Sequence, residues 1–350
     1  MAMSKKLESI LSKQSEQIDN ALSQLFSSLP DFDMYQHLAY FMGFADETFK
    51  PKKIYGGKRF RSSLTMLLGE YYGVSEKTLT AALSIELFHN FTLIHDDIVD
   101  GDELRRGRPT VWKLVGTDHA INSGDAQMLM SLQTVLNDDH LTAKERNLTQ
   151  TFLSQQYLKV IEGQFLDFTL TNQPLGSEGV SEEKYLEMVK RKTADLIAAA
   201  TGVVGVVAAL DESEQQDLFQ YGYLLGTAYQ LCDDVVSIWG SKNQTGKQEY
   251  GDLLAKKKTL PVLKFQEKLS KEQGEIFCTN FNQSKELLVE EAEEIVAQFD
   301  SLGIYELMMS TVNQIAKEAK QSVDNLSLAE TQKHTLKKVV DELLIDIKNV

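Results

Sequence analysis

The sequence has 350 residues, of which 42% are hydrophobic and 25% charged, and its formal net charge at pH 7 is -15. These proportions are typical of a globular protein with one large domain or two average ones. The negative charge argues against non-specific binding to nucleic acid or to an anionic membrane, because both carry charge of the same sign. Clusters of basic residues are therefore expected to serve local sites.

Helical periodicity dominates the chain. The first helix is expected over residues 4–28, and a break follows near residue 30. Further helices are expected over residues 63–73, 75–100, 123–138, 142–170, 181–210, 214–240, 256–269, 284–300 and 304–345. No run alternates between polar and apolar residues for long enough to predict a sheet, and no linker or repeat divides the chain. The sequence predicts one all-α domain over residues 1–350, a bundle of roughly ten or more helices.

Two further features bear on the compartment. The cysteines Cys232 and Cys278 cannot form a disulfide framework and fit no zinc site, which indicates a reducing compartment. The polar N-terminus has no apolar segment of the secretory kind. The most apolar run, residues 196–210, is shorter than the about 20 residues of a membrane span, so a buried helix is expected there. We expect a cytoplasmic protein without a membrane span.

Three aspartates end the helix predicted for residues 75–100, namely Asp96, Asp97 and Asp100. Residues four apart share a helix face, so Asp96 and Asp100 stack and Asp97 lies beside them. An isolated motif of this kind is more often a solvated acidic turn. Residues 91–94, Phe-Thr-Leu-Ile, shortly before the acids, are largely apolar, so the helix is expected to be buried just before its acids begin. That arrangement favours a site for Mg²⁺, which prefers oxygen ligands and often bridges substrate phosphates.

A second acidic pair, Asp233 and Asp234, follows another long apolar helical segment. Two such helix ends that face each other across a bundle core would hold several Mg²⁺ ions between them. A further acid three positions after Asp234 would share the face of Asp233, but this position is occupied by Ser237.

Basic clusters accompany both acidic segments. The stretch Gly56–Arg61, GGKRFR, sets three basic groups beside two glycines and predicts a cradle for a diphosphate, the alternative being a basic helix start. Arg105 and Arg106 follow the first acids closely enough to bind the same phosphates. Residues 190–193, Lys247 and residues 256–258 add basic groups beside the later helices.

These segments, in this order, resemble the trans-isoprenyl diphosphate synthases, also called polyprenyl synthetases. The resemblance covers about residues 50–265 and rests on the segments GGKRFR, HNFTLIHDDIVDGDELRRGRPT, SGDA, GQFLD, KT, YQLCDD, TGKQEYGDL and KKKTLP. It implies an all-α isoprenoid synthase fold around a deep central cavity and a homodimer. It also implies Mg²⁺-dependent condensation of isopentenyl diphosphate with an allylic diphosphate, through an allylic carbocation and loss of a proton.

The resemblance also implies a role for each matching residue. The metal-binding motifs correspond to Asp96, Asp97 and Asp100 and to Asp233 and Asp234, for up to three substrate-bridged Mg²⁺ ions. The isopentenyl diphosphate site corresponds to Lys58, Arg61, His89 and Arg106. Ligands of the allylic diphosphate correspond to Arg105, Lys192, Lys247 and Lys257. Groups near the developing carbocation correspond to Thr193 and Gln230, and a pair that supports the metal shell corresponds to Gln164 and Asp167.

In this family the helix before the first acids lines the tunnel for the growing chain. Phe91 lies roughly 7–8 Å below Asp96 at the rise of an α-helix, with Phe88 deeper and the small Thr92 beside it. A phenyl ring there is expected to stop elongation early, which predicts geranylgeranyl diphosphate (C20), with C15 as the alternative. The competing interpretation is that Phe91 only packs in the core.

Two positions depart from the family pattern. Ser62 replaces a proline, which we expect to alter only a helix start, and Ser237 replaces an aspartate, which weakens the second metal motif. Three alternatives to chain elongation follow: a terpene cyclase, a prenyltransferase that acts on a peptide or other acceptor, and a poorly active regulatory or partner subunit. The basic isopentenyl set argues against the first, and the complete first motif argues against the third.

Overall fold

The computed structural model describes residues 4–54, 57–241, 249–283 and 287–344. Over these ranges the protein is all-α, as predicted. The two strands found there, β1 (Leu104–Arg105) and β2 (Arg108–Pro109), form one short antiparallel hairpin in the loop that follows the first acidic motif.

Contacts along the chain divide it into two compact units. The N-terminal unit comprises Glu8–Tyr157 and Ala199–Gln215, and the C-terminal unit comprises Met1–Leu7, Leu158–Ala198 and Gln216–Val350. Four helices contribute residues to both units: α1 (Lys5–Ser27), α7 (Ala143–Asn172), α9 (Asp195–Val207) and α10 (Glu212–Trp239). The expected single domain stays a prediction.

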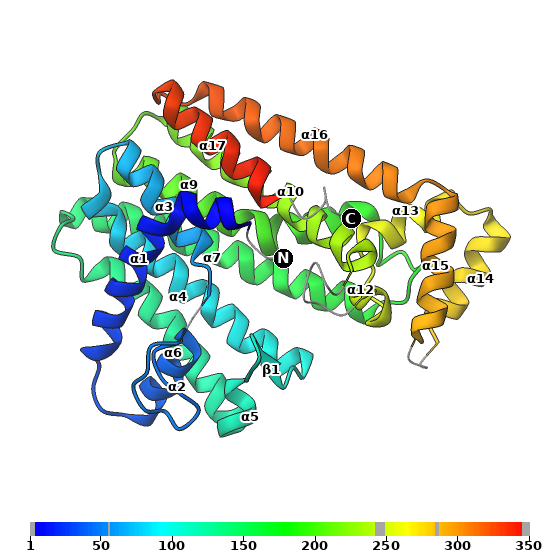
Figure 1. Ribbon diagram of the computed structural model, residues 1–350, viewed down its shortest axis with the longest axis horizontal. Coiled ribbons are helices and arrows are strands. Elements are labelled where there is room, and N and C mark those ends of the chain that lie inside the picture. The colour runs from blue at the N-terminus through cyan, green and yellow to red at the C-terminus, as the bar shows by residue number, and fades with distance from the viewer. Residues whose placement is uncertain (1–3, 55–56, 242–248, 284–286, 345–350) are drawn as a thin grey trace. The chain divides into compact units, whose positions relative to one another are not determined.

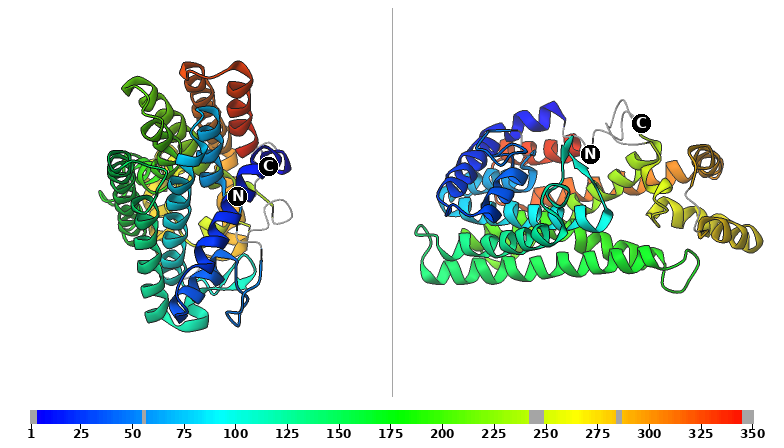
Figure 2. Two further views of the ribbon diagram at one scale, coloured as in Figure 1. Left: turned by 90° about the vertical axis from the view of Figure 1, so that its left-hand side faces the viewer. Right: turned by 90° about the horizontal axis from the view of Figure 1, so that it is seen from below.

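Helix α4 organises the N-terminal unit. It runs over Ser75–Asp100, the range that the sequence predicts, and lies along α3 (Phe60–Tyr71) and α6 (Thr117–Leu136), as Figure 2 shows. The helix stops where Gly101 adopts a left-handed conformation (φ 68°) and donates its N–H to the carbonyl of Asp97. The acidic motif therefore occupies the last helical turn. The remaining helices here are α1 (Lys5–Ser27), α2 (Asp33–Met42) and α5 (Val111–Val115), of which α2 and α5 were not predicted.

The C-terminal unit contains the later helices. These are α8 (Glu182–Val189), α12 (Gly251–Leu254), α13 (Leu260–Lys268), α14 (Lys271–Phe281), α15 (Val289–Ser301), α16 (Ile304–Asn325) and α17 (Glu330–Leu343). Helices α16 and α17 pack side by side, drawn orange and red in Figure 1. The single helix predicted for residues 304–345 is thus two helices, and α14 was not predicted. Phe265 belongs to the core of this unit. Its ring centroid lies 4.9 Å from that of Phe277 and 4.7 Å from that of Phe299.

The segment predicted as one helix over residues 181–210 is interrupted. Between α8 and α9 lies a turn of π-helix, η1 (Lys190–Ala194), which contains Lys192 and Thr193. Single π-helical turns inside helices are frequent at functional sites. The apolar run that follows is a buried helix, as expected. Of the helices in the described part of the chain, none is long and apolar enough to cross a membrane.

Candidate active site

Asp97 is the most deeply buried of the first three acids. Its side chain is 2% exposed and its Oδ1 accepts a hydrogen bond of 2.6 Å from Arg105 Nε. Burial raises the pKa of Asp97 to about 6, against the lowering effect of Arg105. Among the described residues its second oxygen, Oδ2, is buried and has no hydrogen-bond partner. A buried carboxylate with one unoccupied oxygen is costly unless a cation completes it, so this residue fits a metal site.

The other two acids of this motif differ from Asp97 in exposure. Asp96 is half-buried, and Asp100, at the carboxyl end of α4, is exposed.

The three arginines after the acids point to different partners. Arg105 binds Asp97, whereas Arg108 lies 2.9 Å from a carboxylate oxygen of Glu47 and stacks on the Tyr40 ring. Arg106 has a positive φ of 54°, and its guanidinium lies 2.8 Å from where a Cβ on Gly57 would be. Gly57 itself has a φ of 124°, a conformation that favours glycine. The fold thus brings Arg106 next to the GGKRFR segment, which contains Lys58 and Arg61, two of the residues with which it was grouped.

Arg61 and His89 also meet in this unit. Arg61 Nη1 lies 3.3 Å from His89 Nε2. Burial lowers the pKa of His89 well below its usual value, and the positive charges of Arg61, Arg106 and Arg105 lower it further, against the opposite effect of Glu86. His89 is therefore neutral at pH 7, and its ring has both a donor and an acceptor nitrogen. Three of the four residues predicted for isopentenyl diphosphate, Arg61, His89 and Arg106, are gathered here.

Arg59, the remaining basic residue of GGKRFR, does not belong to a ligand cradle. Arg59 is 3% exposed, and its guanidinium binds Asp19 at 2.9 Å, Glu86 at 3.0 Å and the carbonyl of Met42 at 2.9 Å. The predicted cradle of three basic groups is thus reduced to Lys58 and Arg61.

Ser62 was expected only to alter the start of a helix, but its hydroxyl also takes part in the hydrogen-bond network of Glu86. Its hydroxyl lies 2.8 Å from Glu86 Oε2 and 3.0 Å from the carbonyl of Arg59, inside the same network. Burial alone would raise the pKa of Glu86, but Arg59, His89 and Ser62 together lower it to about 2. Glu86 is a buried anion that holds the start of α3 against α4.

The aromatic residues before the acids form a cluster. The Phe91 ring lies 5.3 Å from that of Phe88, which stacks on Tyr157 at 3.8 Å, and the Tyr157 hydroxyl lies 2.8 Å from Ser84 Oγ. The sequence did not predict Tyr157 as part of this cluster, because it lies on α7, far along the chain from Phe88 and Phe91. Thr92 is half-buried and hydrogen-bonded to the carbonyl of His89.

In the C-terminal unit, the π-helical turn is held between α7 and α10 by two glycines. A Cβ on Gly163 would lie 2.2 Å from the backbone nitrogen of Lys192, and one on Gly226 would lie 2.7 Å from Ala194 Cα. This close approach lets Lys192 Nζ bind Asp167 Oδ2 on α7 at 2.5 Å. On the other side, Thr193 Oγ1 donates to Gln230 Oε1 on α10 at 2.8 Å. Gln164 is half-buried on α7.

The network continues to the second acidic pair. Gln230 Nε2 donates to Asp234 Oδ1 at 3.2 Å, and the Tyr185 hydroxyl donates to Asp234 Oδ2 at 2.5 Å. Burial raises the pKa of Asp234 well above its usual value. Both Asp234 oxygens are thus occupied by protein donors, whereas Asp233 is half-buried at the wall of a cavity. Tyr185 was not predicted.

That cavity, about 140 Å³ in volume, gathers most of the predicted residues of this unit. Its lining includes Asp167, Lys192, Gln230, Asp233, Asp234 and Lys257, together with Lys258 of the predicted basic run 256–258. Tyr185, Asp252 and Thr259, which also line it, were not predicted. Thr259 is 5% exposed, and its Oγ1 has no hydrogen-bond partner among the described residues. A buried hydroxyl of this kind points to a polar ligand in the cavity. Lys247 lies outside the described residues.

The predicted metal ligands belong to different units, Asp96, Asp97 and Asp100 to one and Asp233 and Asp234 to the other. Over the described ranges, no group of three or more histidine, cysteine or acidic side chains is close enough to hold an ion by itself. Mg²⁺ usually keeps several waters and takes one or two carboxylates plus substrate phosphates, so these donors still fit it.

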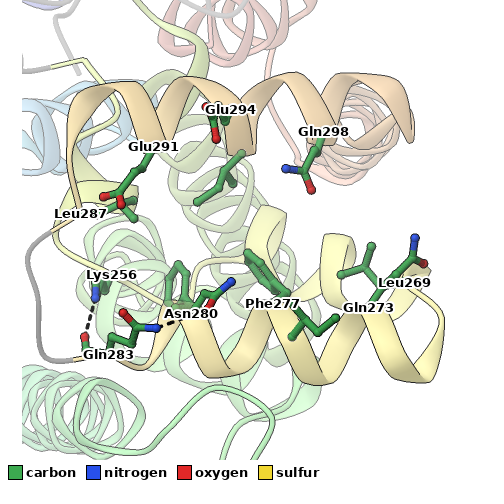
Figure 3. Close-up of a pocket in the computed structure, with 13 residues that line it drawn as sticks. Lys256, Leu269, Gln273, Phe277, Asn280, Gln283, Leu287, Glu291, Glu294 and Gln298 are labelled. Atoms are coloured by element: carbon green, nitrogen blue, oxygen red, sulfur yellow. Dashed lines mark hydrogen bonds between the residues drawn. The ribbon is translucent and has the colours of Figure 1, made fainter.

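A larger cavity, of about 540 Å³, lies elsewhere in the C-terminal unit, between α14 and α15 (Figure 3). Its lining mixes apolar side chains such as Phe277 and Leu287 with amides and the glutamates Glu291 and Glu294. Of the residues predicted for the site, only Lys256 of the basic run 256–258 lines this cavity. Lys256 is also the single basic residue of the lining, and its Nζ donates to the carbonyl of Gln283. The chemistry of this lining does not suit a diphosphate.

Comparison with known proteins identifies the family of this chain. A sequence model of the polyprenyl synthetase family matches residues 47–299. The chain belongs to this family. It is a prenyltransferase.

Individual relatives agree with this assignment. A (2E,6E)-farnesyl diphosphate synthase of Mycobacterium bovis is 35% identical over 263 residues, which cover 74% of this chain and 70% of the relative. A geranylgeranyl pyrophosphate synthase of Geoglobus acetivorans is 38% identical over 212 residues, 60% of this chain and 64% of the relative. The crystal structure of a polyprenyl synthetase from Streptomyces coelicolor A3(2) has a TM-score of 0.85 at 29% identity, covering 96% of this chain and 99% of that one.

Proposed function

We propose that this prenyltransferase condenses isopentenyl diphosphate with an allylic diphosphate to give a short-chain trans-prenyl diphosphate. The observation that carries the proposal is the grouping of Arg61, His89 and Arg106 in the same unit as the acids of α4. A cyclase, or a prenyltransferase with another acceptor, has no use for a second diphosphate site. The relatives named above are diphosphate synthases with C15 and C20 products in their names.

Each group has a task in this reaction. Arg61, Arg106 and Lys58 bind the diphosphate of isopentenyl diphosphate, and neutral His89 completes that site as a hydrogen-bonding group. Lys192, Lys257, Arg105 and Lys247 bind the allylic diphosphate. Thr193 and Gln230, paired in the structure, present oxygen atoms to the carbocation. Mg²⁺, held by Asp96, Asp97, Asp100, Asp233 and Asp234, would neutralise the charge of the departing diphosphate.

The proposal is tested by incubating the protein with Mg²⁺, radiolabelled isopentenyl diphosphate and each allylic primer in turn. Label in a butanol-extractable prenyl diphosphate is the expected result. Absence of incorporation with every primer would contradict chain elongation and direct attention to acceptors other than isopentenyl diphosphate. The cytoplasmic location stays a prediction.

We propose C20 as the product length because Phe91, Phe88 and Tyr157 form a continuous aromatic cluster below the acids of α4. Phe91 is 7% exposed and is the first aromatic ring of the cluster before Asp96. Phe88 and Tyr157 are stacked, and the Phe91 ring lies tilted against Phe88, so the three rings form a packed floor that a growing chain does not displace.

Replacing Phe91 by alanine is expected to shift the main product from C20 to C25 or longer. The change removes the uppermost ring while Phe88 and Tyr157 keep their stack. Reversed-phase chromatography of dephosphorylated products measures the shift. Phe41→Ala, a half-buried aromatic on α2, serves as the matched control and should keep the product length. An unchanged product from Phe91→Ala would assign the ring to core packing alone.

We propose that the chain acts as a homodimer and that the exposed apolar face of α7 joins the two copies. Leu158, Ile161 and Phe165, spaced to share one helix face, are 57%, 41% and 70% exposed. Large apolar side chains exposed together are typical of an interface, and a self-complementary patch on one helix suits twofold symmetry.

Phe165→Glu is expected to convert the dimer into monomers, since it places a charge in the centre of the apolar face. Light scattering coupled to size-exclusion chromatography gives the mass directly. The matched control is Phe32→Glu, which changes an aromatic of similar exposure, 61%, on another surface. A dimer that survives Phe165→Glu but not Phe32→Glu would exclude α7 as the interface.

A further inference from the structure

Ser237 makes a contact that a carboxylate ion at this position could not make. It is 8% exposed on α10, and its hydroxyl oxygen lies 2.5 Å from Asp252 Oδ2 and 3.0 Å from the carbonyl oxygen of Asp234. An ionised carboxylate only accepts hydrogen bonds, so Ser237 is the donor to Asp252. The short distance is that of a hydrogen bond to a charged acceptor, which is about twice as strong as a neutral one.

Asp252 belongs to the same cavity as the second acidic pair. It stands on α12 and lines that cavity together with Asp233, Asp234 and Lys192. Its other oxygen, Oδ1, lies 3.7 Å from Lys257 Nζ, and its backbone carbonyl accepts from the nitrogen of Lys257 at 2.8 Å. Asp252 therefore fixes the segment that contains Lys257 and is itself fixed by Ser237.

An independent feature shows that this cavity is built for a ligand. Thr259, at its wall, precedes the first turn of α13, where a threonine hydroxyl normally accepts a hydrogen bond from the helix. Here the hydroxyl makes no such cap and, within the described part of the chain, no other hydrogen bond, although the residue is 5% exposed. Its donor is left for a polar group inside the cavity.

We propose that Asp252 supplies the third carboxylate of the second acidic motif and that Ser237 is the positioning residue that orients it. This inference rests on the proposed function. The negative charge that an aspartate at position 237 would provide is thus supplied by Asp252 on α12. The hydroxyl restricts the Asp252 rotamer and leaves its charge in the cavity, beside the lysines predicted for the allylic diphosphate.

The test uses the binding of Mn²⁺ in place of Mg²⁺, counted by electron paramagnetic resonance in the presence of inorganic diphosphate. Asp252→Asn removes the charge at nearly constant shape and should raise the half-saturating Mn²⁺ concentration at least about tenfold, as loss of a supporting group around a metal does. Ser237→Ala should raise it severalfold, and Ser237→Thr, which keeps the hydroxyl, should restore binding. In the Asp252→Asn background, Ser237→Ala should have no further effect.

Thermal unfolding of each variant without metal separates a binding effect from a folding effect. A Ser237→Ala effect of equal size in the Asp252→Asn background, or tight Mn²⁺ binding by Asp252→Asn, would overturn the inference. Assays of prenyl product and of Mn²⁺ binding distinguish failure of this inference from failure of the proposed function. If the wild-type protein elongates allylic primers while Asp252→Asn binds Mn²⁺ normally, only this inference fails. If it binds Mn²⁺ with diphosphate, and the variants behave as expected, but forms no prenyl product, only the proposed function fails.

Discussion

Asp97→Asn is expected to abolish prenyl transfer and, at the same time, to make the metal-free protein more stable. The activity should fall by at least about a hundredfold, because a preorganised charge that acts on the departing diphosphate is lost. The stability should rise because Asp97 is ionised at neutral pH at an energetic cost. Its pKa is raised by burial from 3.8 to about 6, and its Oδ2 is buried without a hydrogen-bond partner among the described residues.

The sign of the pH dependence follows from that shift. Between about pH 4 and pH 6 the folded protein binds more protons at Asp97 than the unfolded chain does, so stability falls as the pH rises through this range. At pH 7.5 the asparagine, which mimics the neutral form, should recover about 1–2 kcal/mol of unfolding free energy. The gain should shrink towards zero near pH 4.

Denaturant unfolding in EDTA at pH 7.5 and pH 5 measures this effect, and incorporation of labelled isopentenyl diphosphate measures the activity. Asp100→Asn is the matched control, because Asp100 is exposed and has no burial cost to relieve. It should lower activity without a gain in stability. A destabilised Asp97→Asn protein would show that the carboxylate serves the fold rather than a cation.

Arg59→Met is expected to cost about 3–5 kcal/mol of unfolding free energy, the largest stability effect we predict, because it leaves Glu86 as a buried anion without its cation. The guanidinium is 1% exposed and lies 3.0 Å from a carboxylate oxygen of Glu86. In the wild type the depressed pKa of Glu86, about 2, contributes stability above the unfolded value near 4.5 that is lost as the pH falls towards 2. In the variant, acidification should instead relieve the buried charge.

Two comparisons test this reading of Arg59. The destabilisation should be smaller at pH 4.5 than at pH 7, and the second change Glu86→Leu should recover part of the loss, since removing both charges is far less costly than removing one. Lys13→Met, which removes an exposed ion pair to Glu70, should cost less than about 1 kcal/mol. An equal, pH-independent loss in Arg59→Met and Lys13→Met would contradict a role for the buried pair.

Local patterns in the sequence predicted the helices that carry the chemistry. The range of α4 followed from apolar spacing up to Asp100 and from Gly101, because a glycine there takes the left-handed conformation that ends a helix. The π-helical turn left no such signal. It depends on the close approach of Gly163 and Gly226 from two other helices, and neither glycine is near Lys192 in sequence.

The sequence by itself determined the helical class, the acidic end of α4 and the family, because these depend on residue types at short, fixed spacings. The second acidic pair was expected to end its helix as well, but α10 continues past Asp234 to Trp239. Only the tertiary structure decided which charges serve the fold and which are left for a ligand. The local spacing does not distinguish Arg59 from Lys58 and Arg61, and it is the contacts with Asp19 and Glu86 that assign Arg59 to the fold. Likewise the local pattern gives Ser237 only as a missing aspartate, whereas the structure places its hydroxyl against Asp252. Partners distant in the chain set burial and hydrogen bonding, and short-range spacing contains no information about them.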